Sequence, residues 1–232
     1  AGNIIRPSLK DINFDYETLN FAKKLLLSKK GDNDLLISIT KLFQDNGFEY
    51  LDWKIYCSEL FSKEKNLTSI KPSKKASLNL DKALEVFKNY GKLDIGQSIV
   101  IQNEIVLGLE AAEGTDNLIL RCNDLKRSGD KWVLFKASKY NQSHILDIPT
   151  IGMETLNLLI KNDYEGVFIE KNNCIIIDKN ETINLANNNN LFISTFEKNW
   201  KKIQKYLFVV LNNQVKILHI IYAKDLWNII TR

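Results

Sequence analysis

Three carboxylates stand within seven residues in the segment Glu110-Ala-Ala-Glu113-Gly114-Thr115-Asp116. The segment follows an apolar run that is typical of a strand, and Thr115 can cap a helix that begins there. Carboxylate oxygens are preferred ligands of Mg²⁺, and a helix N-terminus presents backbone N–H groups to phosphate. The segment therefore suits a combined metal and phosphate site. It equally suits an acidic helix start with no further role, because acids favour that end of a helix.

A second group of polar residues surrounds the loop after the next predicted strand. Lys136 and Lys139 can contact a phosphate or a sugar there. Asp147 precedes an Ile-Pro pair, whose proline holds the chain extended, and Thr150 or Gly152 opens the following helix. An aspartate fixed between a strand and a helix can position water or bind a metal, although it can also serve only to turn the loop.

A third segment, Leu-Asp-Ile-Gly96-Gln97-Ser, stands at the start of a predicted strand. Gly96 allows a close approach of the backbone, since it has no side chain. The amide of Gln97 can hydrogen-bond a uracil or a sugar. By itself this segment does not distinguish a binding site from an ordinary strand entry.

Cysteines and histidines exclude several kinds of chemistry. Cys57, Cys122 and Cys174 are far apart and form no CxxC pair, so neither a zinc knuckle nor a disulfide framework is expected. Reduced and mostly buried thiols in a cytoplasm are the better interpretation. The two histidines, His144 and His219, cannot form an HExxH zinc motif, and histidine-based catalysis is not expected.

The positive charge lies in the C-terminal segment. The 232 residues carry a formal charge of +4, yet residues 195–232 alone hold seven basic and two acidic side chains. The rest is close to neutral, which argues against nucleic acid as a partner. Trp200, Ile203, Leu207 and Val210 fall at helical spacing among lysines, so a basic amphipathic helix is expected. Such a helix can lie on an anionic membrane, pack on the domain, or be non-native sequence.

The elements that must position these residues alternate between strands and helices. Residues 98–102 and 105–109 form a predicted hairpin, 153–161 a helix, 48–53 a strand, and 167–170 with 174–178 a strand pair. An α/β fold class follows from the alternation. No apolar run reaches the roughly 18 residues of a membrane-spanning helix.

Together these residues resemble the UDP-2,3-diacylglucosamine pyrophosphatases of the I type, which act in lipid A biosynthesis. The resemblance rests on the sequence GKLDIGQSIVIQNEIVLGLEAAEGTDNLI at 91–119, the spacing of Lys136, Lys139 and Gln142, and DIPTIG at 147–152. It covers residues 1 to about 194. The basic tail has no counterpart in the family.

The resemblance implies two α/β domains with a cleft between them, of which the N-terminal one is incomplete in this chain. Residues 1–70 would be the remainder of that domain, 71–94 a linker and connecting helix, and 95–194 the catalytic domain. Residues 195–232 would be a basic tail of uncertain origin.

The resemblance also implies a Mg²⁺-dependent hydrolase that splits UDP-2,3-diacylglucosamine into UMP and 2,3-diacylglucosamine 1-phosphate. The enzyme would be cytoplasmic, in peripheral contact with the inner membrane of a Gram-negative bacterium, and it could form a homo-oligomer. Two alternatives remain: a fragment that binds substrate without turnover, and a phosphohydrolase for another nucleotide sugar. The second arises because Ser143 and Ile145 replace an aspartate and an arginine that the family usually carries.

Residue roles follow from matching motifs. Asp147, Glu113 and Asp116 would be catalytic, and the same three with Glu110 would bind the metal. Contacts to the substrate would come from Gln97, Gly114, Thr115, Lys136, Lys139, Gln142, Thr150 and Gly152.

Overall fold

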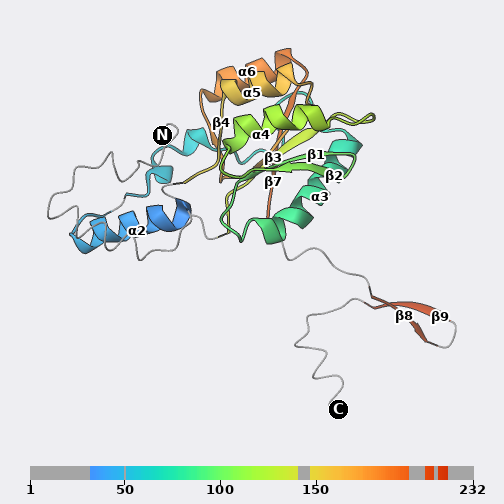
Figure 1. Cartoon of the computed structure of the whole chain (residues 1–232), viewed down its shortest axis with the longest axis horizontal. Coiled ribbons are helices and arrows are strands. Elements are labelled where there is room, and N and C mark those ends of the chain that lie inside the picture. Colours follow the sequence, from blue (N-terminus) through green and yellow to red (C-terminus); the bar gives the residue numbers. More distant parts are fainter. Residues whose placement is uncertain (1–31, 50, 141–146, 199–206, 212–213, 219–232) are drawn as a thin grey trace. The chain divides into compact units, whose positions relative to one another are not determined.

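The computed structural model describes residues 32–49, 51–140, 147–198, 207–211 and 214–218 (Figure 1). The chain divides into two compact units, Ala1–Phe196 and Glu197–Arg232. The first contains a five-stranded sheet with helices, and the described part of the second is a two-stranded hairpin.

A mixed sheet forms the centre of the first unit. Its strands lie in the order β2-β1-β3-β5-β7, and β1 is antiparallel to both neighbours, whereas β3, β5 and β7 are parallel. The strand bounds are β1 Ser98–Gln102, β2 Ile105–Leu109, β3 Val133–Lys136, β5 Gly166–Glu170 and β7 Phe192–Phe196. The expected α/β class is confirmed.

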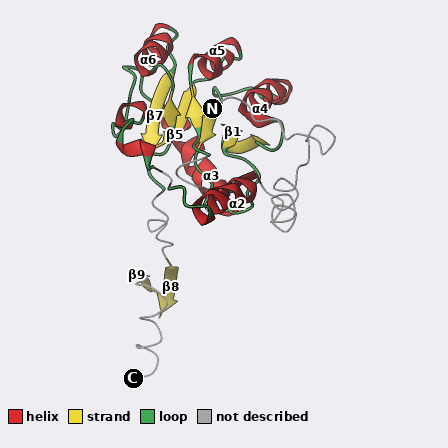
Figure 2. Ribbon diagram, turned by 90° about the vertical axis from the view of Figure 1, so that its left-hand side faces the viewer, coloured by secondary structure: helices red, strands yellow, loops and turns green. Residues whose placement is uncertain are grey.

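Helices cover both faces of this sheet, as Figure 2 shows. Helix α3 (Lys74–Tyr90) lies on one face, and α4 (Gly114–Cys122), α5 (Met153–Lys161) and α6 (Lys179–Asn188) lie on the other. The remaining described elements are α2 Asp32–Asp45, the 3₁₀ turns Trp53–Ile55, Ser58–Leu60 and Asn123–Leu125, the short parallel pair β4 Thr150–Ile151 and β6 Ile175–Ile176, and the hairpin β8 Leu207–Leu211 and β9 Gln214–Leu218.

Alternating side chains of β3 serve the two faces, because successive residues of a strand point to opposite sides. Leu134 joins the core cluster under α4, α5 and α6. The ring of Phe135 lies 5.2 Å from that of Phe87 in α3 and 4.6 Å from that of Phe196. Both faces are thus packed, and the polar side chains gather at the sheet's edge.

The predicted hairpin is confirmed with the bounds expected from the sequence. Its turn residues, Asn103 and Glu104, have φ values of 53° and 59°. Two consecutive positive values are typical of the type I′ turn, whose twist matches that of the strands. The helix at 153–161 is confirmed as well.

Three predicted elements are wrong. The described residues of segment 48–53 form no strand, because Phe48 and Leu51 are 62% and 64% exposed and no partner strand buries either face. The segments at 167–170 and 174–178 do not pair with each other. Strand β5 instead lies between β3 and β7, and β6 pairs with β4.

The third wrong element is the C-terminal helix. Leu207 and Val210 lie in β8, which pairs with β9 as an antiparallel hairpin. The run Leu-Phe-Val-Val-Leu is rich in β-formers, and two asparagines that suit a turn follow it in the sequence. Trp200 and Ile203 lie outside the described residues. The predicted division of residues 1–194 stays a prediction.

Candidate active site

The first unit brings the start of one strand and the ends of two others to the same edge. Ser98, which begins β1, pairs with Lys136, the last residue of β3. Ile99 pairs with Leu109, the last residue of β2. The antiparallel direction of β1 therefore places the residues just before β1 beside those just after β2 and β3. In α/β sheets the carboxyl edge of the parallel strands is the usual place for ligands.

Gln97 connects two carboxylates at this edge. Its backbone N–H donates to Oε2 of Glu110 at 3.0 Å, and its side-chain Nε2 donates to Oδ1 of Asp147 at 2.9 Å. Its carbonyl accepts from the N–H of Ala137 at 2.9 Å, so both neighbouring strand ends fix its position. The structure thus brings together three residues that the sequence predicts for the site.

Thr115 connects the same group to a lysine. Its hydroxyl donates to Oε1 of Glu110 at 3.0 Å and lies 3.2 Å from Oγ of Ser98. It also accepts from Nζ of Lys136 at 2.7 Å. Lys136 is only 7% exposed. The prediction that Thr115 caps α4 is wrong, because Glu113 holds the N-cap position and Thr115 lies inside the helix. Glu113 makes no side-chain capping bond.

Lys139 lies between two carboxylates. Its ammonium is 2.6 Å from Oδ1 of Asp94 and 3.5 Å from Oδ2 of Asp147, and the side chain is 7% exposed. Burial disfavours the charged form, but the two carboxylates outweigh burial and raise the pKa of Lys139 above its usual value. The lysine is therefore a fixed cation beside Asp147.

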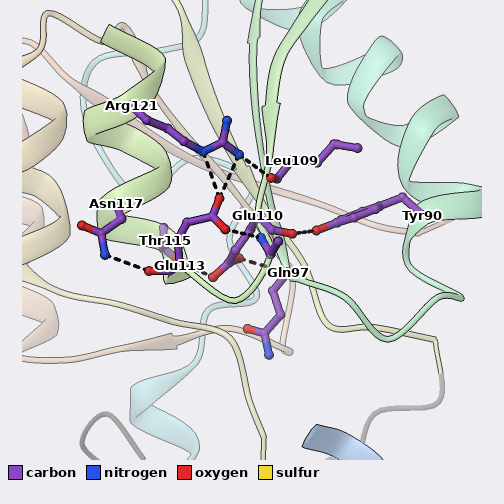
Figure 3. Close-up of polar contacts among 9 residues, drawn as sticks. Tyr90, Gln97, Leu109, Glu110, Glu113, Thr115, Asn117 and Arg121 are labelled. Atoms are coloured by element: carbon purple, nitrogen blue, oxygen red, sulfur yellow. Dashed lines mark hydrogen bonds and ion pairs between the residues drawn. The ribbon is translucent and has the colours of Figure 1, made fainter. Parts of the chain in front are cut away.

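Glu113 is paired with Arg121 rather than free to bind a ligand, as Figure 3 shows. Arg121 donates from Nε at 3.0 Å and from Nη2 at 2.8 Å to Oε1 of Glu113, and Nη2 also reaches the carbonyl of Leu109 at 2.7 Å. Burial opposes ionisation of Glu113, yet hydrogen bonds from the backbone and Arg121 hold its pKa below the usual value. The pair fixes the turn between β2 and α4.

A close backbone contact fixes the other side of Glu110. The hydroxyl of Tyr90 donates to the Glu110 carbonyl (Figure 3). A Cβ added at Gly96 would stand 2.2 Å from this carbonyl and 2.4 Å from the Tyr90 hydroxyl. The predicted close approach at Gly96 is confirmed, and the neighbouring atoms are those of the protein itself.

The contacts above join ten residues into one cluster at the sheet edge: Tyr90, Asp94, Gln97, Glu110, Glu113, Thr115, Arg121, Lys136, Lys139 and Asp147. Several predicted residues are not part of this cluster. Asp116 is exposed at the start of α4, and the Thr150 hydroxyl donates to the carbonyl of Ile148 at 3.1 Å. Gly152 occupies the cap position of α5. Gly114 adopts a φ of 78°, which glycine takes without strain. Gln142 lies outside the described residues.

The carboxylates do not assemble into a metal site of the predicted size. Among the described residues, no three histidine, cysteine, aspartate or glutamate side chains lie close enough together to hold an ion. Glu113 is held by Arg121, and Glu110 by Gln97 and Thr115. Where substrate phosphates are present, Mg²⁺ needs only one or two protein carboxylates. Asp147 fits this smaller demand, and a ligand set of all four carboxylates stays a prediction.

Three residues of the cluster were not among the predicted site residues. Asp94 lies in the same segment as Gln97, but the sequence pattern there indicates only Gln97 as a binding residue. Arg121 stands eight positions after Glu113, outside helical pairing distance. Tyr90 ends a helix and looks like core. In each case the partner is defined by the fold, not by spacing along the chain.

The thiols do not contribute to the site. Cys122 and Cys174 are buried, which agrees with the expectation of mostly buried thiols. Burial raises the pKa of Cys122 to about 11 and that of Cys174 to about 12. Neither would be a thiolate at neutral pH. Both histidines lie outside the described residues.

The described helices include none with the length and apolar character to cross a membrane.

Comparison with known proteins gives two matches. The family of the LpxI C-terminal domain matches residues 63–194, a range that contains all the residues of the cluster. The protein named UDP-2,3-diacylglucosamine pyrophosphatase LpxI, from Caulobacter vibrioides, is 32% identical over 203 residues. This alignment covers 83% of the present chain and 71% of the relative.

Proposed function

Because the chain belongs to the LpxI family, we propose that it hydrolyses UDP-2,3-diacylglucosamine in lipid A synthesis. Water would form a bond to the phosphorus on the sugar side, and the bond from that phosphorus to the bridging oxygen would break. UMP would leave with the bridging oxygen, and 2,3-diacylglucosamine 1-phosphate would remain.

The observation that supports the proposal most directly is a continuous set of polar contacts at the sheet edge. It runs from Lys136 through Thr115, Glu110 and Gln97 to Asp147 and Lys139. Two buried cations thus flank fixed carboxylates. Hydrolysis of a pyrophosphate depends on charge neutralisation and an aligned water more than on a covalent nucleophile. Among the described residues, the cluster supplies cations that can neutralise charge and a fixed carboxylate that can orient water.

Asp147 would orient the attacking water. Gln97 holds one of its oxygens and Lys139 the other, so the carboxylate has a fixed direction. A group held in place before reaction contributes more than a mobile one. Lys136, whose ammonium has three N–H donors of which Thr115 takes one, would contact a phosphate oxygen.

We also propose that the reaction depends on Mg²⁺. Asp147 and the phosphates of the substrate would hold the ion, with Asp116 as a further candidate because its carboxylate is exposed at the start of α4. The ion would neutralise charge on the phosphates. Glu110 and Glu113 would instead support the protein around it, since Glu110 is buried and Glu113 is held by Arg121 at 2.8 Å. Asp147 is 27% exposed, and its contact with Lys139 is longer, at 3.5 Å.

The proposed cellular setting follows from the substrate. A cytoplasmic enzyme that acts on a diacylated sugar would meet it at the inner membrane, so peripheral membrane contact is part of the proposal. The basic residues of segment 195–232 would favour anionic lipid. Homo-oligomer formation stays a prediction.

The test is UMP release by the full chain from UDP-2,3-diacylglucosamine, with Mg²⁺ and with excess chelator. Asp147→Asn should lower kcat by about 100-fold or more, because the variant removes the charge that orients water. Asp124→Asn is the matched control, since Asp124 is exposed in the turn after α4.

Other outcomes would redirect the proposal. Full activity of Asp147→Asn would remove this residue from the mechanism. Release of UMP from UDP-N-acetylglucosamine in preference to the acylated substrate would indicate a different nucleotide-sugar hydrolase. Binding of the acylated substrate without UMP release would indicate a chain that only binds it.

A further inference from the structure

Asp94 adopts a backbone conformation that few side chains tolerate. Its φ is 53°, in the left-handed region where Asn and Asp are enriched among residues other than glycine. It follows the C-terminal turn of α3, in which the N–H of Leu93 donates to the carbonyl of Tyr90 at 3.0 Å. Such conformations persist where the surrounding structure holds them and are concentrated at functional sites.

Two backbone hydrogen bonds hold this turn against the segment that carries Lys139. The N–H of Tyr140 donates to the carbonyl of Gly91 at 3.0 Å, and the N–H of Ala137 donates to that of Gln97 at 2.9 Å. The bonds stand on either side of both Asp94 and Lys139. The two side chains therefore face each other because the backbones are joined.

The carboxylate of Asp94 depends on this lysine. Both of its oxygens are buried, and neither accepts a hydrogen bond of good geometry from the described residues. Its contact with the Lys139 ammonium, at 2.6 Å, is an ion pair. A carboxylate removed from water is costly unless a charge compensates it.

Lys139 is shared unequally between its two carboxylates. Asp94 stands nearer than Asp147, at 2.6 Å against 3.5 Å. If Asp94 lost its charge, Asp147 would be the carboxylate beside the buried ammonium among the described residues, and the ammonium would move toward it. The closer pair would occupy the Asp147 oxygen that has to face the reaction.

We propose that Asp94 is a positioning residue, which holds the Lys139 ammonium at a distance from Asp147 so that Asp147 stays oriented but accessible. The inference rests on the proposed hydrolysis, in which Asp147 orients water. It assigns to Asp94 an effect on the chemical step and not on substrate binding.

The test compares three variants of the full chain. Asp94→Asn keeps the size of the side chain and its tolerance of the left-handed conformation but removes the charge. It should lower kcat about 10-fold or more with a KM change below about threefold, as expected for an interaction used in the transition state. Asp94→Glu should recover part of kcat because it restores the anion. Asp81→Asn, an exposed change in α3, is the control.

The melting temperature separates positioning from folding. Asp94→Asn should unfold near the temperature of the parent chain. Wild-type kcat in Asp94→Asn would overturn the inference. A loss of kcat shared equally by Asp94→Asn and Asp94→Glu, with a lowered melting temperature, would show a structural role and overturn it too.

A second readout does not require turnover. Amine labelling followed by mass spectrometry measures the reactivity of Lys139 relative to exposed Lys88. Asp94→Asn should change this ratio at least about threefold, because the ammonium loses its nearer partner. An unchanged ratio would overturn the inference. If the parent chain released no UMP while the ratio changed, the proposed function would fail and the Asp94–Lys139 contact would stand.

Discussion

Thr115 shows how a single hydroxyl can join a cation and an anion that do not touch. It accepts a hydrogen bond from the ammonium of Lys136 and donates one to the carboxylate of Glu110. Each bond therefore matches a charged group with the partner it needs. Bonds to charged groups are stronger than those between neutral groups. The hydroxyl thereby links the first turn of α4 to the ends of β2 and β3.

The buried thiols allow a prediction at the same scale. Because burial raises the pKa of Cys122 to about 11 and of Cys174 to about 12, the folded chain holds both thiol protons more tightly than the unfolded chain. Their contribution to stability is complete below the unfolded value of 9.0 and is lost as the pH rises toward the folded values. The free energies of unfolding of the parent and of Cys174→Ala, measured by denaturant titration, should therefore converge as the pH rises from 8 to 12.

Thiol titration gives the corresponding control. At pH 8 in the native state, Ellman's reagent should modify half-buried Cys57 well before Cys122 or Cys174, and all three should react in denaturant. Rapid modification of Cys174 in the folded chain would contradict the burial described above. A constant difference between parent and Cys174→Ala at every pH would contradict the pKa assignment.

At the scale of the elements, two glycines control how the strands meet α3 and α4. Gly114 needs glycine for its φ of 78°, and a Cβ there would meet no other atom within 4 Å. Gly96 needs glycine for the opposite reason, because its space is already filled by the Glu110 carbonyl and Tyr90. One constraint is conformational and the other is steric.

Alanine substitutions should separate these constraints. Gly114→Ala should lower the free energy of unfolding by about 1 kcal/mol, the cost of a left-handed residue. Gly96→Ala should lower it by about 2 kcal/mol or more, since backbone atoms have to shift to admit the methyl group. Gly47→Ala is a control for strain alone, because Gly47 has a φ of 83° and open space around it. Equal losses in Gly96→Ala and Gly114→Ala would contradict the steric account.

The sequence predicts elements whose signals are local. The hairpin of β1 and β2 follows from two β-forming runs around a two-residue turn, and α5 follows from its helical spacing. Segment 48–53 has strand-like residues but no partner, and the composition of the run cannot show this. Pairing of β5 with β3 and β7 likewise depends on crossovers that periodicity does not define.

The candidate site divides in the same way. Gln97, Glu110, Thr115 and Asp147 carry recognisable motifs, and the fold brings all four together. Their electrostatic partners are set by strand register and turn geometry, which motifs do not encode. A motif therefore cannot predict that Glu113 pairs with Arg121, and this pair is what makes Glu113 a weaker candidate ligand.

On the scale of the whole molecule, the chain consists of units with different compositions. The first, Ala1–Phe196, contains the sheet and the cluster. The second, Glu197–Arg232, contains the hairpin β8–β9 and all of the basic excess noted in the sequence. Folding and catalysis are properties we expect of the first unit alone.

Truncation tests this separation. A chain that ends at Lys198 should melt within about 2 °C of the full chain, because each unit is compact by itself. It should release UMP at the same rate from substrate dispersed in detergent, where membrane contact plays no part. It should also sediment less with anionic vesicles, since the basic residues are lost. Truncation before Phe192 should abolish folding, because it removes β7. A large fall in melting temperature for the Lys198 truncation would show that the sheet needs the second unit.

The antiparallel direction of β1 also bears on how the site assembles during folding. Residues 97, 110 and 136 lie at the same sheet edge, and a two-residue turn connects β1 to β2 between the first two of them. Loop-closure entropy grows slowly with length, so contacts within this short span cost little to form. Strands β5 and β7 have to cross over through helices before they pair. The edge that holds the candidate site can therefore form from neighbouring segments, before the parallel half of the sheet is complete.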